Sequence, residues 1–188
     1  MEIISSLEDR ETIYKRLLHD NDFIKNLSDA GKLLTASVRS GKAVLVCGNG
    51  GSAAESMHMS AELVGRFRTN RTALPSISLV SDTASLTAVA NDFGYKEIFA
   101  RQVEAYHDFS GAVVLLSTSG NSENLLAAAK QAKKYGLSTI SILGKDGGQL
   151  KNFCDIVLLV PSFDTPIIQE VHLALIHMLC GMIEDGYH

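Results

Sequence analysis

The segment Ala43-Val44-Leu45-Val46-Cys47-Gly48-Asn49-Gly50-Gly51-Ser52 passes from an apolar run into a glycine-rich loop. The residues that follow favour a helix, which carries His58 and Glu62. A glycine-rich loop between a strand and a helix lets backbone N–H groups and the positive end of the helix dipole approach a phosphate or a sugar oxygen. We therefore expect a ligand to bind where this strand ends.

A second strand-to-loop pattern occurs later in the chain. The apolar run Ala112 to Leu116 leads into Ser117-Thr118-Ser119-Gly120-Asn121-Ser122, and the segment Glu123 to Tyr135 then favours a helix. Serine and threonine are ordinary turn and cap residues, but four hydroxyls directly after a buried strand, with Ser122 as the helix cap, suit a phosphate dianion. We expect the two loops to form two walls of one site.

Five apolar runs are typical of buried β-strands. They are Lys42 to Cys47, Ser76 to Val80, Ala112 to Ser117, Thr139 to Leu143 and Ile156 to Val160. Helical patterns lie between them, and near-continuous apolar strands separated by helices predict a parallel sheet covered on both faces. We therefore predict an α/β fold, a doubly wound, flavodoxin-like sheet of five parallel strands, in a single domain over residues 1–188.

Both ends of the chain are expected to be helical. Apolar residues recur at helical spacing over the first forty residues, which predicts one or two amphipathic helices before the sheet. The last helix begins near Pro166, and its stretch from Val171 to Cys180 is apolar on nearly every face. Such a helix must be buried, and at a chain end we expect a second subunit to cover it. The first and last helices are thus predicted to form an oligomer.

The composition is that of a globular protein and argues against binding to nucleic acid or a membrane. Hydrophobic residues make up 46% of the chain and charged residues 20%, and no run of about 18 apolar residues is available to span a bilayer. The net charge of -4 opposes general nucleic-acid binding, so Arg66, Arg68 and Arg71 are expected in a solvated loop or a subunit contact, with phosphate binding as the less favoured alternative. The N-terminus lacks the order of a signal peptide, which predicts a cytoplasmic protein.

Two other chemistries fit the glycine-rich loop less well. Cys47 beside the loop could be a nucleophile, but a small apolar residue at a strand end is the commoner role. The pattern Gly48-x-Gly50-x-x-Ala53 also matches a dinucleotide-binding fingerprint. The ribose-binding acid should come about 20 residues later, yet the candidate, Asp82, stands well beyond that point. A nicotinamide-dependent dehydrogenase is therefore a distant alternative.

The spacing of His58 and Glu62 places their side chains one above the other on one helix face. Such a pair can share a divalent metal or act as acid and base, although on an exposed helix it is more often merely solvated. Its position just after the glycine-rich loop favours a functional role. On the last helix, we expect His172 to be a hydrogen-bonded core residue and His177 to be a ligand only if a partner approaches it.

Six motifs occur in order over nearly the whole chain. They are Cys-Gly-Asn-Gly-Gly-Ser at 47–52, His58-x-x-x-Glu62 with Leu63-x-Gly65-Arg66, Asn91-Asp92-Phe93-Gly94, Ser-Thr-Ser-Gly-Asn-Ser at 117–122, Gly144-Lys145-Asp146-Gly147-Gly148, and Ile168-Gln169-Glu170 with His172 and His177. In this order they resemble the phosphoheptose isomerases.

This resemblance implies the sugar isomerase (SIS) fold and an aldose–ketose isomerase that converts sedoheptulose 7-phosphate to D-glycero-D-manno-heptose 7-phosphate through an enediol. The product would serve ADP-heptose and lipopolysaccharide core biosynthesis or another surface glycan. The resemblance also implies a homotetramer with active sites between subunits and one zinc ion per subunit.

The resemblance further implies a role for each residue that matches a motif. The zinc ligands would be His58, Glu62, Gln169 and His177, with Glu62 and His177 also serving as acid and base. Phosphate would be bound by Ser117, Thr118, Ser119 and Ser122. Sugar hydroxyls would be bound by Asn49, Gly50, Gly51, Asn91 and Asp92, with Gln169 as a further substrate contact.

Two of the implied zinc ligands, Gln169 and His177, lie far apart on the predicted last helix. Gln169 and His177 are eight residues apart, which on a straight helix is a rise of about 12 Å and a rotation of about 80°. One metal ion would lie at the limit of both side chains, so we expect these two ligands to come from different subunits. The family usually has an arginine two residues before the glutamine, where this chain has Ile167, so the contacts at the start of this helix stay open.

Two alternatives share the same fold. One SIS branch resembles these isomerases but associates with the bacterial replication initiator, and it lacks counterparts of Glu62 and His177, which this chain retains. Another sugar-phosphate isomerase, such as a hexulose-phosphate enzyme of similar length, would differ in its substrate. The retained acid and base favour an enzyme over a non-catalytic binding protein.

Overall fold

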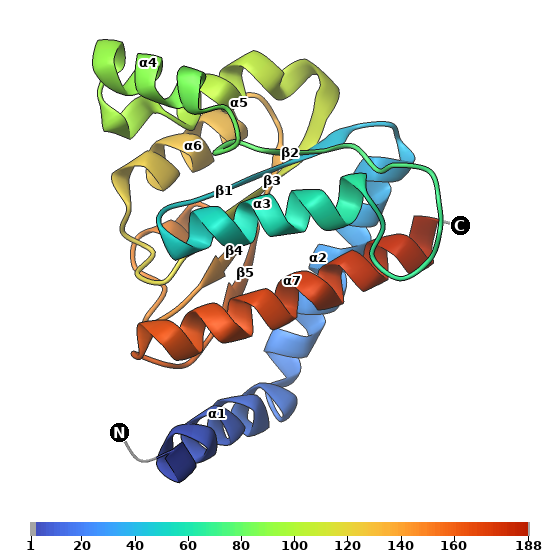
Figure 1. The fold of residues 1–188 in the computed structure, drawn as a ribbon, viewed down its shortest axis with the longest axis vertical. Helices are drawn as coiled ribbons and strands as arrows, with labels where there is room; N and C mark the ends of the chain where they lie inside the picture. The colour runs from blue at the N-terminus through green and yellow to red at the C-terminus, as the bar shows by residue number, and fades with distance from the viewer. Residues whose placement is uncertain (1–2, 188) are drawn as a thin grey trace.

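The computed structural model describes residues 3–187, which contain a sheet of five strands in the order β2-β1-β3-β4-β5 (Figure 1). The strands are β1 (Ala43–Gly48), β2 (Ser76–Ser78), β3 (Ser110–Ser117), β4 (Ser138–Leu143) and β5 (Ile156–Leu159). Every neighbouring pair is parallel. All five predicted strands are therefore confirmed, and the order is that of the flavodoxin-like doubly wound fold.

Helices cover both faces of this sheet (Figure 1). One face carries α2 (Asn21–Arg39), α3 (Gly51–Val64) and α7 (Thr165–Tyr187), and the other carries α4 (Thr83–Phe93), α5 (Ala100–Tyr106) and α6 (Glu123–Lys134). Three short 3-10 helices lie in the connections: η1 (Tyr95–Glu97), η2 (His107–Phe109) and η3 (Leu150–Asn152). Helix α1 (Ile3–Leu18) extends away from the sheet at the N-terminal end.

Successive residues of the central strands enter two separate cores. Val44 and Val46 of β1 pack with α2, α3 and α7, whereas Leu45 and Cys47 pack with α5 and α6. This alternation explains why the strands are apolar at every position rather than at every second one. Burial raises the pKa of the Cys47 thiol, so this side chain is a packed apolar residue, as expected, and not a nucleophile.

The chain changes direction across the sheet at β1. From β1 it crosses by α3 to β2 on one side, and β3 then lies on the other side of β1 with Gly48 in register with Leu116. The loops after β1 and β3 therefore open side by side at the carboxyl edge of the sheet. This switch point is where open α/β sheets bind ligands.

Helix α7 is covered mainly by its own chain. It packs against α2 and α3, and 11 of its residues are buried. The expectation that a second subunit supplies the cover was therefore wrong for most of the helix, and only its outer side is open, with Met178 47% exposed. By length and composition α7 could also span a bilayer, contrary to the expectation from the sequence, but 56% of its most apolar window is buried within the chain, as in the core helix of a soluble protein.

The loop after α3 is held by a buried ion pair. Arg66 and Arg68 are exposed, as expected, but the Arg71 side chain is only 1% exposed and its Nε donates to a Glu184 carboxylate oxygen at 3.1 Å. The solvated position predicted for Arg71 was therefore wrong. Glu184 also accepts hydrogen bonds from the backbone N–H groups of Phe67, Arg68 and Thr69.

The Glu184 carboxyl should make folding stability fall in acid. Burial alone would raise its pKa, but the N–H groups of Thr69, Arg68 and Phe67 that donate to the carboxylate hold the pKa at about 2. The unfolded chain takes up the proton near the ordinary pKa of about 4.3, so this stabilisation is complete above that pH and declines as the pH falls toward 2. In thermal unfolding between pH 6 and pH 3, the melting temperature of the wild type should fall more steeply with decreasing pH than that of Glu184→Gln. Equal slopes for the two proteins would contradict this assignment.

Candidate active site

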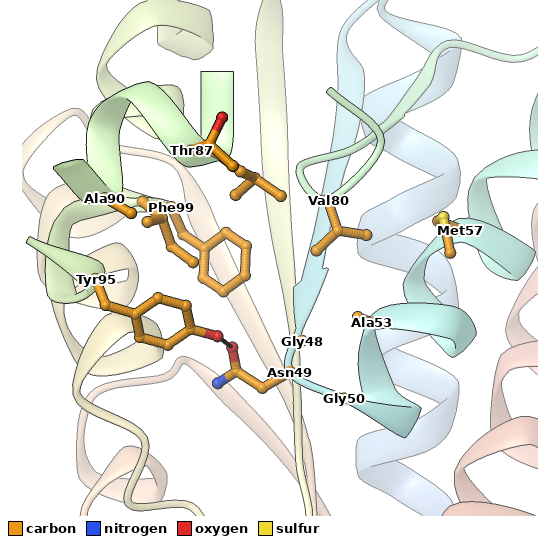
Figure 2. Close-up of a pocket in the computed structure, with 12 residues that line it drawn as sticks. Gly48, Asn49, Gly50, Ala53, Met57, Val80, Thr87, Ala90, Tyr95 and Phe99 are labelled. Carbon is orange, nitrogen blue, oxygen red and sulfur yellow. Dashed lines mark hydrogen bonds between the residues drawn. The ribbon is translucent and has the colours of Figure 1, made fainter. Parts of the chain in front are cut away.

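The two polar loops meet through a pair of asparagine side chains. Nδ2 of Asn49 donates to Oδ1 of Asn124 at 2.9 Å, and Nδ2 of Asn124 donates to Oδ1 of Asn49 at 2.8 Å. The Tyr95 hydroxyl also donates to Oδ1 of Asn49 at 2.9 Å (Figure 2). Oδ1 of Asn49 thus accepts two bonds, and Nδ2 keeps one hydrogen for a ligand. Sequence reasoning missed Asn124 and Tyr95; an asparagine two residues after the expected helix cap was a signal for the first of them.

The loop 117–122 has hydroxyls in two different situations. Ser117 is buried, and its Oγ accepts the Gly120 N–H at 3.0 Å, while Oγ of Ser119 accepts the Asn121 N–H at 3.3 Å. Ser122 is at the N-cap position of α6, but its hydroxyl makes no capping bond, so the cap predicted for this side chain was wrong in that respect. A hydroxyl that does not cap the helix is free to donate to an anion. The phosphate-binding role of this loop stays a prediction.

A second glycine-rich turn, at residues 144–148, packs against the loop 117–122. Gly120 has a φ of 65°, and a Cβ there would lie 2.0 Å from the carbonyl oxygen of Gly147. The Leu150 N–H donates to the Gly120 carbonyl at 2.9 Å, and the Gln149 N–H donates to Oδ1 of Asn121 at 3.0 Å. The backbone of the loop is therefore fixed before any ligand binds.

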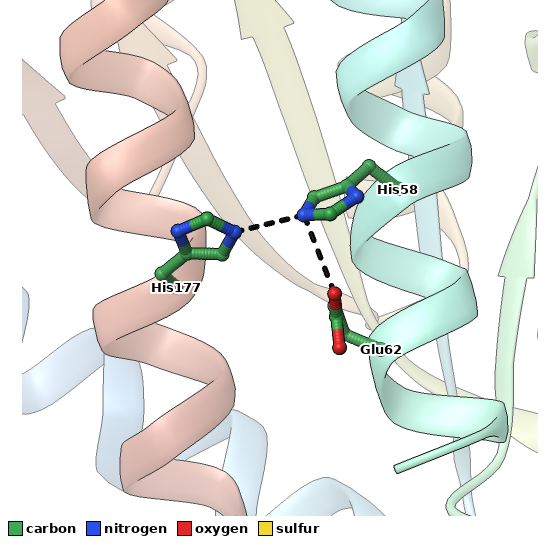
Figure 3. Close-up of side chains that lie close together, drawn as sticks. All are labelled: His58, Glu62 and His177. Atoms are coloured by element: carbon green, nitrogen blue, oxygen red, sulfur yellow. Dashed lines mark hydrogen bonds and ion pairs between the residues drawn. The ribbon is translucent and has the colours of Figure 1, made fainter. Parts of the chain in front are cut away.

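Three ionisable side chains converge between α3 and α7 (Figure 3). Nε2 of His58 lies 2.8 Å from Nε2 of His177 and 3.5 Å from Oε1 of Glu62, and one ligand atom from each residue lies within 4.8 Å of the others. His58 and Glu62 come from successive turns of α3, as predicted. The condition set for His177 is met, because α3 approaches it from within the same chain.

This cluster has the donor set of a metal site. Two imidazole nitrogens that face each other repel through their lone pairs unless a proton or a cation lies between them. Two nitrogens on one tetrahedral zinc ion stand about 3.3 Å apart, so the rings would need to separate by about half an ångström. The three residues therefore fit a zinc ion as protein ligands, with a fourth position left for another ligand.

Gln169 lies away from the cluster within the chain. A Cβ on Gly51 would be 2.2 Å from its Nε2, so the amide rests against the first turn of α3. His58 comes seven residues later, about 10 Å further along the helix. Asn91 and Asp92 lie on α4, where both are exposed and Nδ2 of Asn91 donates to Oδ1 of Asp92. The structure brings neither this pair nor Gln169 to the His58, Glu62 and His177 group.

His172 is a core residue, but it lacks the hydrogen bonds expected for one. It is fully buried, neither ring nitrogen has a hydrogen-bond partner among the described residues, and Nδ1 lies 3.7 Å from Oε2 of Glu55. The apolar surroundings on α7 predicted the burial, while the missing partners could not be foreseen. Glu55 and His172 lie between the Gly51–Gln169 contact and the cluster along the same two helices.

A cavity of about 340 Å³ lies beside the glycine-rich loop, on the α4 side (Figure 2). Met57, Val80 and Phe99 line it with apolar atoms, and Asn49 and Tyr95 stand at one wall. Met57 and His58 are successive residues of α3, so they point about 100° apart around the helix. The cavity and the cluster therefore lie on different sides of α3.

Comparisons with known proteins agree along nearly the whole chain. A family model described as an SIS domain matches residues 10–144. A phosphoheptose isomerase of Clostridium acetobutylicum is 47% identical over 97% of this chain and 91% of its own length. One from Helicobacter pylori is 46% identical over 97% of this chain and 88% of its own length.

Two solved structures extend the likeness to three dimensions. A phosphoheptose isomerase from Francisella tularensis has a TM-score of 0.89 at 34% identity and covers 97% of this chain and 96% of its own. A phosphoheptose isomerase from Neisseria gonorrhoeae has a TM-score of 0.87 at 32% identity and covers 97% of each chain.

Replacing Ser119 and Ser122 with alanine should weaken phosphate binding. Two charge-assisted bonds are lost, so binding of a sugar phosphate should weaken by about 1 to 3 kcal/mol, or about 5- to 150-fold, in calorimetry. Because Ser122 makes no capping bond, the variant should melt close to the wild type. Ser28→Ala on α2 is the control and should bind normally; wild-type affinity in the double variant would rule out this loop as the phosphate site.

Proposed function

The chain belongs to the phosphoheptose isomerases of the SIS-domain family, and on that premise we propose that it converts sedoheptulose 7-phosphate to D-glycero-D-manno-heptose 7-phosphate. It is an aldose–ketose isomerase of sugar phosphates. The observation that carries the proposal is the convergence of His58, Glu62 and His177. The proposed place of action is the cytoplasm, in the supply of heptose for lipopolysaccharide core or another surface glycan.

The proposed cofactor is one zinc ion per subunit. His58, Glu62 and His177 would hold it through two imidazole nitrogens and a carboxylate, a ligand set that zinc accepts. When bound, the ion supplies a Lewis acid that polarises the substrate carbonyl. All three side chains are half-buried.

The isomerisation moves one proton between neighbouring carbons. The Glu62 carboxylate takes the proton from C1 of the ketose, and His177 gives a proton to the oxygen on C2, which yields the 1,2-enediol. Glu62 then returns its proton to C2 while His177 takes the proton of the oxygen on C1, so an aldehyde forms and both side chains regain their starting states. Both groups lie on rigid helices, which keeps the donor and the acceptor on a fixed path.

The proposed phosphate site is the loop 117–122, with the sugar hydroxyls on the glycine-rich loop. The backbone of the loop 117–122 is held by Gly147 and Gln149, and the remaining Nδ2 hydrogen of Asn49 is available to donate to a ligand oxygen. Donors fixed in advance lose little entropy when they bind an anion. This arrangement favours a phosphorylated open-chain sugar over a neutral one.

The proposed assembly is a homotetramer with active sites between subunits. Glu62 and His177 meet within one chain, whereas Gln169 rests two helical turns away against Gly51. A Gln169 ligand for the metal would therefore come from a neighbouring chain. The sequence-based separation of Gln169 from His177 is kept in this proposal. Asn91 and Asp92 stay proposed sugar contacts at the end of α4, the helix that lines the cavity beside Asn49.

Two other functions remain as outcomes of the tests below. A non-catalytic SIS protein that binds the replication initiator would have no use for the convergence of His58, Glu62 and His177. A different sugar-phosphate isomerase would use the same cluster, and direct competition between hexulose and heptulose phosphates distinguishes the two substrates.

Glu62→Gln should abolish most turnover without unfolding the protein. The amide keeps the size of the side chain but cannot take the C1 proton, so kcat should fall by about 100-fold or more. The conversion of sedoheptulose 7-phosphate is the assay, and exposed Glu11→Gln on α1 is the control. If Glu62→Gln retains near-normal turnover, the cluster is only a solvated face and the binding-protein alternative gains.

Mixed subunits should reveal how the site is shared. Co-expression of Glu62→Gln chains with Gln169→Ala chains should restore up to about a quarter of the sites, because one random pairing in four combines an intact cluster with an intact Gln169. Glu62→Gln mixed with His177→Ala should restore none, since both residues belong to one chain's cluster. Equal recovery in both mixtures, or full activity in a monomer, would refute the shared site.

A further inference from the structure

Arg71 caps the C-terminal end of α3, the helix that carries His58 and Glu62. Its guanidinium donates through Nη2 to the carbonyl of Glu62 at 2.9 Å and through Nη1 to the carbonyl of Leu63 at 2.8 Å. These carbonyls belong to the last turn of α3, whose acceptors have no partner within the helix. Nη1 also donates to the carbonyl of Thr72 at 3.1 Å, and Nε donates to the Glu184 carboxylate. One side chain therefore joins the backbone of Glu62 to α7.

Phe67 provides a second connection from the same carboxylate to the cluster. Its backbone N–H donates to Oε2 of Glu184 at 3.3 Å, and its ring stacks on the His177 ring with the centroids 5.7 Å apart and the planes 30° from parallel. The Arg68 guanidinium lies over the Phe67 ring, 5.1 Å from its centroid. Phe67 therefore covers one face of the His177 ring, whose Nε2 faces His58.

Glu184 and His177 lie on the same face of α7. They are seven residues apart, which is two turns with an offset of only about 20°. Glu184 is 2% exposed and therefore anchors this face of α7 against the loop 65–71 that follows α3. A buried ion pair between Arg71 and Glu184 thus holds the C-terminal end of α3 against α7, beyond the point where His58 and Glu62 meet His177.

We propose that Arg71, Glu184 and Phe67 are positioning residues for the metal cluster, a role that rests on the proposed function. Arg71 sets the backbone position of Glu62, and Phe67, held by Glu184, sets the orientation of the His177 ring. Some residues contact the metal ligands without contacting the metal itself. Mutation of such residues typically lowers metal affinity by about 10- to 100-fold. The Arg71–Glu184 ion pair is buried beside the cluster and therefore acts on its ligands in addition to its effect on stability.

The chain contains a matched control for this arginine–glutamate pair. Arg10 of α1 donates through Nε and Nη2 to the Glu170 carboxylate, which also lies on α7. This second pair is more exposed and contacts no member of the cluster. Arg10→Lys and Arg71→Lys therefore make the same chemical change opposite a glutamate of α7, and only the second loses the bonds to the end of α3.

The test measures transfer of Zn²⁺ from the loaded full-length protein to a chromophoric chelator. Arg71→Lys and Phe67→Leu should bind Zn²⁺ about tenfold or more weakly than the wild type, and Arg10→Lys should stay within about twofold. Phe67→Leu keeps the N–H bond to Glu184 and therefore tests the site even if Arg71→Lys fails to fold. Wild-type Zn²⁺ affinity in folded Phe67→Leu would overturn the proposal.

A second measurement separates this proposal from the proposed function. In the metal-free protein, the nuclear Overhauser effect between the His58 and His177 imidazole signals should weaken in Phe67→Leu but not in Arg10→Lys, because Phe67 no longer holds the His177 ring. If the wild type binds no Zn²⁺, the proposed cofactor is wrong, and this Overhauser effect alone decides the positioning role. An unchanged effect in Phe67→Leu would overturn it.

Discussion

Helices α3 and α7 run parallel and in contact on one face of the sheet, although more than a hundred residues separate them in the chain (Figure 1). At one end Gly51 lets them approach, since a side chain there would collide with Gln169. At the other end Glu184 binds the loop that follows α3. His58 and His177 meet between these two contacts. The cluster thus depends on how α3 and α7 are aligned along each other. Close packing of Gly51 on Gln169 fixes this alignment at one end, and the hydrogen bonds and ion pair of Glu184 fix it at the other.

The sheet supplies the second constraint, since it brings the two polar loops together. β1 and β3 are neighbours, so their loops open at one edge, and the paired amides of Asn49 and Asn124 join them. Backbone held in this way offers donors whose positions do not change on binding. The edge of the sheet and the α3–α7 pair are consequently two preorganised regions of one molecule, one suited to an anion and the other to a cation.

Features that depend on local pattern could be predicted from the sequence. Five apolar runs predicted the five strands, and the spacing of His58 and Glu62 predicted their shared face. Features that depend on contacts between distant segments could not. A helix that is apolar all round reveals that it is buried but not by what, so the cover of α7 was assigned to another subunit. Arg71 looks like its exposed neighbours until Glu184, 113 residues away, is placed beside it. The site also needs Asn124 and Tyr95, whose partners only the fold identifies.

Helix α4 differs from every other long helix around the sheet in how it is held. None of its 11 residues, all within the described chain, is buried, and its first turn is fixed by Oδ1 of Asp82, which accepts the Ser85 N–H. Few apolar contacts oppose its separation from the sheet, so its backbone amides should exchange with solvent at a far lower free energy of opening than those of β1 and β3. Because α4 forms one wall of the cavity beside Asn49, that cavity can widen through local opening while the sheet and the α3–α7 pair stay folded.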